Sequence, residues 1–359
     1  HRDTGVLLYD EGRATPGFTL VVPLVGRSAY LIGMRGEVLH QWNFPLTPGN
    51  YGYLLPNGNL LWSGRTDEGP PLRRGKGWLM REIDWDGNVV WEYIDHGQHH
   101  DFRRMENGNT VYLGWEKMPE DAQARVQGGL PGTEKDGAIY GDYLREVDRD
   151  GKTVWEWHIH ELDDIERLTL LPTVDREEFA HGNACTPLAD GNVMVSFRRI
   201  STIAIIDRAT KQFRWEMRDD GWGTTHDCEM LPDGHITCFA NGIYTPLNPF
   251  SRALEIDPET RKVVWEYRGQ PTWTFFSPNI SGVQRLWSGN TLICEGQMGR
   301  IFEVTPAGEI VWEYVNPFFG PYDWFGLERG GFGNSVFRAY RYAPDAPEIA
   351  GRVRFPYGP

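Results

Sequence analysis

The chain has 359 residues, a formal net charge of -14 at pH 7 and an aromatic content of 13%. This acidic balance argues against nucleic acid and against an anionic membrane as partners, because neither would gain from counterion release or surface attraction. No apolar run in the sequence approaches the length of a membrane span. The first residue is His1 rather than Met, so the compartment cannot be read from this end.

A motif made of a turn, a β-branched pair and a tryptophan recurs six times. Its tryptophans are Trp42, Trp91, Trp155, Trp215, Trp265 and Trp312. Successive copies lie 47 to 64 residues apart, which is the size of a four-stranded propeller blade. We expect these tryptophans to pack the blades rather than to bind a ligand.

A second motif places Asn-Gly, Asp-Gly or a related pair between two β-rich runs, a strong signal for a hairpin. Its turn glycines are Gly58, Gly108, Gly191, Gly234, Gly289 and Gly333. One hairpin of each kind per blade predicts an all-β fold, a six-bladed β-propeller formed by residues 1–359 as a single domain. The chain opens on a tryptophan repeat and ends on a glycine hairpin, so one blade should be closed by strands from both termini.

The four cysteines form no metal-type pair and are too few for a disulfide scaffold, so we expect buried, unpaired thiols. Cys228 and Cys238 flank one hairpin. With Asp233-Gly234 as a two-residue turn, these two thiols would lie on opposite sides of the ribbon.

Two insertions interrupt the blade period, at about residues 118–140 and 158–180. The second contains Leu162 to Leu168, which could form a short helix. In an up-and-down blade both connections emerge on the same face. We therefore expect both insertions at one mouth of the propeller, where long loops are usually functional.

The start of each first strand carries a polar or aromatic residue. Eight residues before the turn glycine stand Asn50, His100, His226, Ser281 and Phe325, and His181 stands ten before Gly191. First strands line the channel of a propeller, so His100, His181 and His226 should converge at its mouth. His226 is our first candidate for the reacting group.

Arg199 lies eight residues after Gly191, at the end of a second strand, and should return close to His181 and Asn183. Three imidazoles, a guanidinium and an amide would suit an anion with tetrahedral oxygens. One imidazole would act as nucleophile and another as general acid or base, although a structural ion pair is the alternative for Arg199. The candidates for substrate binding are Asn183, Asn50, Ser281, Trp222 and Phe325.

At these residues the chain resembles the bacterial aryl-sulfate sulfotransferase family. The similarity covers His100-Asp101, His226-Asp227 and His181-x-Asn183 with Arg199. It extends to the runs Gly17 to Leu20, Ala29 to Ile32, Gly289 to Gly296 and Phe337 to Tyr342. The resemblance implies a six-bladed propeller that moves a sulfuryl group from an aryl sulfate ester to a phenol, without a nucleotide sulfate carrier and without a cofactor.

The resemblance also assigns roles to residues. His226 matches the histidine that forms a transient sulfo-histidine, and His100, His181, Asn183 and Arg199 match the groups that hold the sulfate and move protons. It implies small-molecule partners, a homodimer and a periplasmic location, with a cytoplasmic location as the alternative. The family's later Lys-Thr pair and its cysteine pair have no evident match here.

Two other functions are compatible with the same residues. A metal-dependent lyase or hydrolase would use His100, His181 and His226 as ligands of a divalent metal ion. A non-catalytic propeller would instead bind a partner at its mouth.

Overall fold

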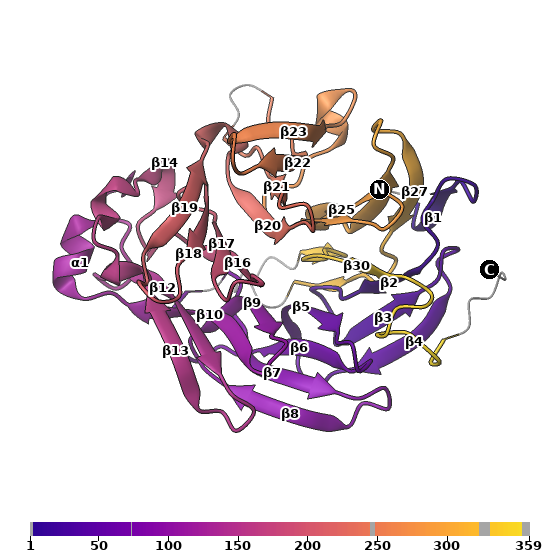
Figure 1. The fold of residues 1–359 in the computed structure, drawn as a ribbon, viewed down its shortest axis with the longest axis horizontal. Helices are drawn as coiled ribbons and strands as arrows, with labels where there is room; N and C mark the ends of the chain where they lie inside the picture. The colour runs from indigo at the N-terminus through magenta and orange to yellow at the C-terminus, as the bar shows by residue number, and fades with distance from the viewer. Residues whose placement is uncertain (1–2, 73, 245–247, 323–330, 354–359) are drawn as a thin grey trace. The chain divides into compact units, whose positions relative to one another are not determined.

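The computed structural model describes residues 3–72, 74–244, 248–322 and 331–353. The fold is a six-bladed β-propeller, as the two repeats predicted (Figure 1). Its blades divide equally between two compact units. Unit 1 comprises His1–Arg65, Leu79–Ile94 and Thr274–Pro359, and unit 2 comprises Thr66–Trp78 and Asp95–Trp273.

Unit 1 contains three blades and a short extra ribbon. The first blade has the order β30-β2-β3-β4, the second β5-β6-β7-β8, and the third β24-β25-β26-β27 with β1 as a fifth strand. The strands are β1 (Gly5–Tyr9), β2 (Phe18–Val21), β3 (Ser28–Ile32), β4 (Val38–Asn43), β5 (Pro48–Leu54), β6 (Leu60–Arg65), β7 (Trp78–Ile83), β8 (Val89–Ile94), β24 (Gly282–Arg285), β25 (Thr291–Glu295), β26 (Arg300–Val304), β27 (Ile310–Val315), β28 (Gly320–Pro321), β29 (Phe332–Gly333) and β30 (Tyr340–Tyr342).

Unit 2 also contains three blades, ordered β9-β10-β12-β13, β16-β17-β18-β19 and β20-β21-β22-β23. The strands are β9 (Gln98–Arg104), β10 (Thr110–Lys117), β11 (Gly128–Leu130), β12 (Tyr140–Val147), β13 (Thr153–His158), β14 (Leu170–Asp175), β15 (Glu178–Phe179), β16 (Gly182–Pro187), β17 (Val193–Phe197), β18 (Thr202–Ile206), β19 (Phe213–Arg218), β20 (Thr225–Met230), β21 (Ile236–Ala240), β22 (Arg252–Asp257) and β23 (Lys262–Tyr267). The helices of the described chain are short, namely α1 (Glu120–Arg125), η1 (Ile159–Glu161), η2 (Ile165–Arg167), η3 (Asp220–Trp222), η4 (Thr272–Thr274) and η5 (Gly296–Met298). None of them has the length and apolarity that a membrane crossing needs.

The glycine hairpins turn through three residues rather than two. In the hairpin of β20 and β21, Leu231 N donates to His235 O over 2.7 Å, and Gly234 N donates to Leu231 O over 2.9 Å. Gly234 has a φ of +89°, which only glycine adopts without strain. The extra turn residue changes the register, so our prediction for Cys228 and Cys238 was wrong: both thiols lie in one hydrophobic cluster. All four cysteines are buried and none of them forms a disulfide, as predicted.

The repeated tryptophans join neighbouring blades. Within unit 1, Trp42 Nε1 donates to Asp84 O over 3.1 Å, and Trp312 Nε1 donates to Met34 O over 2.8 Å. Within unit 2, Trp155 Nε1 donates to Arg208 O over 3.0 Å. Each acceptor lies at the β-turn between the last two strands of the next blade. These contacts confirm that Trp42, Trp312 and Trp155 are packing residues.

Strands from both ends of the chain close the first blade, as predicted. β30 pairs with β2 as its inner strand, while β2, β3 and β4 come from the N-terminal side. β1 extends the sheet of β24 to β27 by pairing with β27 (Figure 1). The predicted sixth glycine hairpin is wrong, because Gly333 lies in β29 and pairs with Gly320 instead of turning the chain. The C-terminal side therefore supplies one strand of the closed blade.

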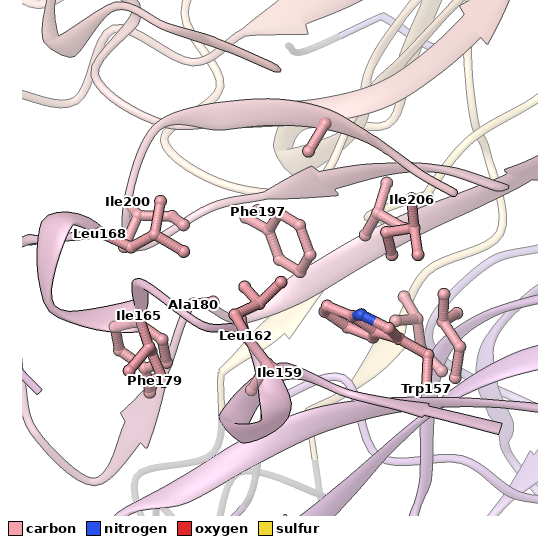
Figure 2. Close-up of a cluster of buried hydrophobic side chains, with 14 of the residues drawn as sticks. Trp157, Ile159, Leu162, Ile165, Leu168, Phe179, Ala180, Phe197, Ile200 and Ile206 are labelled. Atoms are coloured by element: carbon pink, nitrogen blue, oxygen red, sulfur yellow. The ribbon is translucent and has the colours of Figure 1, made fainter. Parts of the chain in front are cut away.

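The two insertions pack together in unit 2. β11 from the first insertion pairs in parallel with β14 from the second, and β15 pairs with β12. Figure 2 shows Leu162 of the second insertion beside Trp157 of β13 and Phe197 of β17, with Phe179 and Ile165 of the same insertion together at the other side of the cluster. The segment expected to form a short helix contains only the single-turn η2. This shared core holds in place the segment before β16, which contains Glu177 and Glu178.

Candidate active site

The first strands of unit 2 lose their simple alternation where the predicted histidines lie. In β20, His226 pairs with Phe239 but the next pair is Glu229 with Thr237, so the strand carries a bulge. The intervening Asp227 has a φ of +53°. His100 and His181 themselves have φ of +49° and +60°. Bulges re-aim side chains and are common next to active sites, which keeps these histidines as candidates.

His226 is buried, with 1% of its surface exposed, and its ring orientation is fixed by Asn241. The distance from His226 Nδ1 to Asn241 Oδ1 is 2.6 Å. Thr224 Oγ1 donates to the same oxygen over 3.0 Å. An amide oxygen only accepts, so His226 carries its proton on Nδ1, and the neutral ring has its lone pair on Nε2.

His100 is oriented through a second imidazole. His99 Nε2 lies 3.2 Å from Asp142 Oδ1, and His99 Nδ1 lies 2.8 Å from His100 Nδ1. His99 Nε2 has no partner in hydrogen-bond geometry among the described atoms. In the contact between the two Nδ1 atoms, one ring donates and the other accepts. His99 also stacks on Trp115, with ring centroids 3.9 Å apart.

His181 is held by the second insertion. Its Nδ1 donates to Glu178 Oε1 over 2.5 Å, and both residues are buried. Its ring lies 4.5 Å from the ring of His100, in an edge-on arrangement. The insertion therefore contributes the carboxylate that sets the His181 tautomer, and the lone pair of this ring is also on Nε2.

Burial and nearby positive charge keep two of these imidazoles neutral. The pKa of His100 lies well below its ordinary value because of burial, and then because of the charges of His181, His99, His226 and Arg198. The pKa of His181 is also well below its ordinary value, because of burial and then the charges of Arg198 and Arg199. At neutral pH both rings are therefore uncharged.

Two neighbouring arginines have different surroundings. Arg199 is buried in ion pairs, with Nη2 at 2.9 Å from Glu177 Oε1 and 3.0 Å from Glu178 Oε1. Arg198 is also buried, yet its guanidinium makes no hydrogen bond or ion pair with any residue that the structure describes. Burial, followed by the charges of Arg199 and Arg74, lowers the pKa of Arg198 to about 10.

Burying a cation is costly, and among the described carboxylates the charge of Glu178 acts on Arg198 without forming an ion pair with it. Arg198 depresses the pKa of both His100 and His181, so its charge lies close to the two rings. Of the two arginines, Arg199 has the environment of a structural ion pair. The predicted role of Arg199 in catalysis stays a prediction.

The other predicted site residues lie in four different places. Asn183 is buried beside His226, and its Nδ2 donates to Thr225 O over 2.7 Å. Trp222 is fully buried in the hydrophobic cluster that contains Cys228, so its surroundings are those of a packing residue. Asn50 and Ser281 are buried in unit 1, and Ser281 Oγ accepts from Gly296 N over 3.0 Å. Phe325 lies outside the described residues.

Sequence analysis missed several residues of the site because it counted one position too far. Trp115, Arg198 and Asn241 each stand seven residues after a turn glycine, namely Gly108, Gly191 and Gly234. All three contact or influence the imidazoles, whereas our count of eight selected Arg199. A shift of one residue moves a side chain to the other face of a strand. Taking the seventh residue after the turn glycine would have identified Trp115, Arg198 and Asn241.

The cluster differs from a metal site in its spacing. In the described chain, two groups of histidine and carboxylate residues bring their ligand atoms within 4.8 Å of one another. They are Glu116, His158 and His160, and Asp233, His235 and Glu255. The trio His100, His181 and His226 is not among these groups, and the alternative role of the three imidazoles as metal ligands stays a prediction.

The fold and this cluster define a propeller protein with buried histidines and arginines gathered in the blades of unit 2. The family model of arylsulfotransferases (ASST) matches residues 54–317, and the chain belongs to this family. The match includes all the histidines and arginines of the site. Family membership therefore confirms the resemblance that the sequence motifs indicated.

The first of three similar solved structures supports the fold. A protein of unknown function from Bacteroides caccae has a TM-score of 0.57 and 13% identity, covering 91% of this chain and 99% of that chain. A virginiamycin B lyase from Staphylococcus aureus has a TM-score of 0.42 and 11% identity, covering 81% of this chain and 83% of that chain. A streptogramin B lyase has a TM-score of 0.47 and 12% identity, covering 88% and 83%. No curated protein matches the chain.

Proposed function

We propose that the chain transfers a sulfuryl group from an aryl sulfate ester to a phenolic acceptor through a sulfo-histidine at His226. Membership of the arylsulfotransferase family supports a sulfotransferase-like enzyme. The observation that carries the proposal is the hydrogen bond from His226 Nδ1 to Asn241 Oδ1 at 2.6 Å. It puts the lone pair of the neutral ring on Nε2, which is the atom that would attack sulfur.

Arg198 would bind the sulfuryl oxygens. Its planar guanidinium offers several N–H donors in a forked arrangement that matches a tetrahedral oxyanion. An anionic ester would also offset the crowding of positive charge from Arg198, Arg199 and Arg74. Donors that face the oxygens throughout the transfer stabilise the charge that moves from sulfur to the leaving oxygen.

The reaction would proceed in two balanced halves. In the first, His226 Nε2 forms a bond to sulfur, the bond from sulfur to the phenolic oxygen breaks, and the leaving phenolate takes a proton from an imidazole. In the second, the oxygen of the acceptor phenol forms a bond to sulfur, the bond from sulfur to Nε2 breaks, and the acceptor's proton returns to that imidazole.

His100 and His181 are the candidates for this proton transfer. Their pKa values are low while positive charge surrounds them, and a bound anion would raise those values. Substrate binding would therefore be accompanied by proton uptake. The proton bound in this way is the one that the leaving phenolate needs, so binding would prepare the acid for the first half of the reaction.

The test is ping-pong kinetics with a nitrophenyl sulfate as donor and a phenol as acceptor. His226→Ala should abolish turnover, and mass spectrometry of the unsubstituted chain without acceptor should find one SO₃ group on the peptide that contains His226. His235→Ala is the matched control, because His235 lies in the same hairpin and is paired with Glu255. Unchanged turnover in His226→Ala, with an intact fold by circular dichroism, would refute the proposal.

A further inference from the structure

A second group of titratable side chains lies in unit 2, outside the imidazole cluster. Glu116 stands near the end of β10, eight residues after Gly108, and so follows Trp115 on the other face of the strand. His158 ends β13 and His160 lies in η1. The arylsulfotransferase chemistry proposed above uses none of these three residues.

The three side chains converge on one point. His158 Nδ1 lies 2.6 Å from Glu116 Oε1, and His160 Nδ1 lies 3.2 Å from the same oxygen. One ligand atom from each of the three residues lies within 4.8 Å of the other two. His160 Nδ1 is shielded from solvent, yet it has no partner in hydrogen-bond geometry among the described atoms, since the carboxylate lies off its axis. One carboxylate oxygen therefore serves two imidazoles and satisfies only one.

We propose that Glu116, His158 and His160 bind a divalent transition-metal ion of the Zn²⁺ class. Two imidazole nitrogens and one carboxylate oxygen are the ligands found in zinc sites that keep one position open for water. They also disfavour Ca²⁺ and Mg²⁺, which prefer oxygen ligands alone.

The spacing suits a tetrahedral ion after small side-chain movements. Ligand atoms at about 2.1 Å from such an ion lie about 3.4 Å from one another. The contact from His160 to Glu116 is already close to that value, and the contact from His158 to Glu116 must open by less than about 1 Å. The side chains of the imidazoles are 18% exposed and that of Glu116 is 30% exposed, so an ion can enter from solvent.

The local charge favours a cation. The carboxylates of Glu116, Glu156 and Glu161 all act on His158 by their charge. Three carboxylates thus lie near an imidazole that is neutral when it acts as a ligand. The other histidine and carboxylate group, Asp233, His235 and Glu255, sits at a hairpin turn with the Asp233 side chain 63% exposed. An exposed ligand binds less well than a half-buried one, so that group serves as the internal comparison.

From its position, a bound ion would stabilise the structure where the two insertions leave the blade. Glu116 stands just before the first insertion, and His158 and His160 open the second. Ile159, between the two histidines, is fully buried in the core that joins both insertions (Figure 2). An ion at this point would clamp the ends of β10 and β13, from which the insertions leave the blade.

The experiment is calorimetric titration of the chelator-treated 359-residue chain with Zn²⁺, followed by Co²⁺ and its visible absorption spectrum. One saturable site per chain is expected, with a rise in Tm on metal addition. His158→Gln, His160→Gln and Glu116→Gln should each weaken binding on the order of tenfold or more. His235→Gln should bind as the unsubstituted chain does.

Three results would overturn the proposal. They are no saturable binding in the unsubstituted chain, unchanged affinity in both His158→Gln and His160→Gln, and loss of binding in His235→Gln instead. The first result needs no variant, so a folding defect cannot obscure it. Circular dichroism of each variant without metal separates lost ligands from lost structure.

Discussion

Asn241 Oδ1 accepts hydrogen bonds from both His226 Nδ1 and Thr224 Oγ1, at the ends of the paired strands β20 and β21. This oxygen acts on the reaction through His226, so Asn241 is a positioning residue. Asn241→Ala should lower kcat on the order of 10- to 100-fold while KM changes little, because ring orientation is lost but the anion site is intact. Steady-state kinetics with a nitrophenyl sulfate will measure both constants.

Asn241→Asp provides the matched variant. It keeps an oxygen that accepts from His226 Nδ1, so it should retain more of kcat than Asn241→Ala. Equal loss in both variants would show that the amide has another function.

Arg198 should oppose stability in the absence of substrate. Replacing it with Met removes a buried charge that has no ion pair among the described residues, so the free energy of unfolding should rise. The same change should raise KM for the aryl sulfate, because the donors for its oxygens are lost. Thermal melts and kinetics on one preparation test both effects, and a destabilised Arg198→Met would contradict this account.

Arg199 should behave in the opposite way to its neighbour. Arg199→Met leaves Glu177 and Glu178 without their common cation, and Glu178 is buried. Breaking a buried ion pair from one side costs about 3–5 kcal/mol, so this variant should unfold at a lower denaturant concentration. Comparison of the Arg198 and Arg199 variants by urea denaturation separates a ligand-binding arginine from a structural one.

Stability should fall on mild acidification because of His100 and His181. Their folded pKa values lie well below the ordinary value near 6.5, so the unfolded chain binds more protons than the folded chain below that pH. The free energy of unfolding therefore decreases as pH falls from about 6.5 toward the folded pKa values. Urea denaturation across this range should show a shallower slope with pH in His181→Gln, and an unchanged slope would contradict the assignment.

Gly75 leaves room for the ring of His100. A Cβ at Gly75 would lie 1.9 Å from His100 Cε1, and the φ of Gly75 is +85°. Gly75→Ala should therefore displace the ring, lower kcat and cost about 1–3 kcal/mol of stability. Gly132→Ala is the control, because Gly132 has a φ of +80° but no atom within 4 Å of its Cβ position. Gly132→Ala should have the same backbone strain as Gly75→Ala but should keep the kcat of the unsubstituted chain.

The repeats in the sequence were sufficient to predict the fold. Trp42 and Trp312 belong to the motif that recurs at blade spacing, and both donate to a backbone carbonyl at a turn of the next blade. The contacts are equivalent because each blade packs against its neighbour in the same way. Gly333 was assigned to a turn because the sequence around it resembles that of the other hairpins. In the structure Gly333 pairs instead with Gly320 of β28, which its local sequence does not indicate. Short motifs report local geometry, and pairing across the chain overrides them.

The site was predicted only in part. His100, His181 and His226 were found because they occupy equivalent repeat positions. Glu178 was not singled out because it lies in an insertion without a repeat, although it stands only three residues before His181. Arg198 was missed because the bulges and three-residue turns shift the register by one residue, and neither feature has a clear sequence signature.

The strand β30 reaches back across the whole length of the chain to pair with β2. Ribosomal synthesis proceeds from the N-terminus, so β2, β3 and β4 emerge first but lack their inner strand until Tyr340–Tyr342 has been made. The first blade to appear is thus the last to be completed. Until β30 has been synthesised, the edge of β2 is unpaired and can pair with strands of other chains. The risk of aggregation during synthesis therefore depends on the time that elapses between the synthesis of β2 and that of β30.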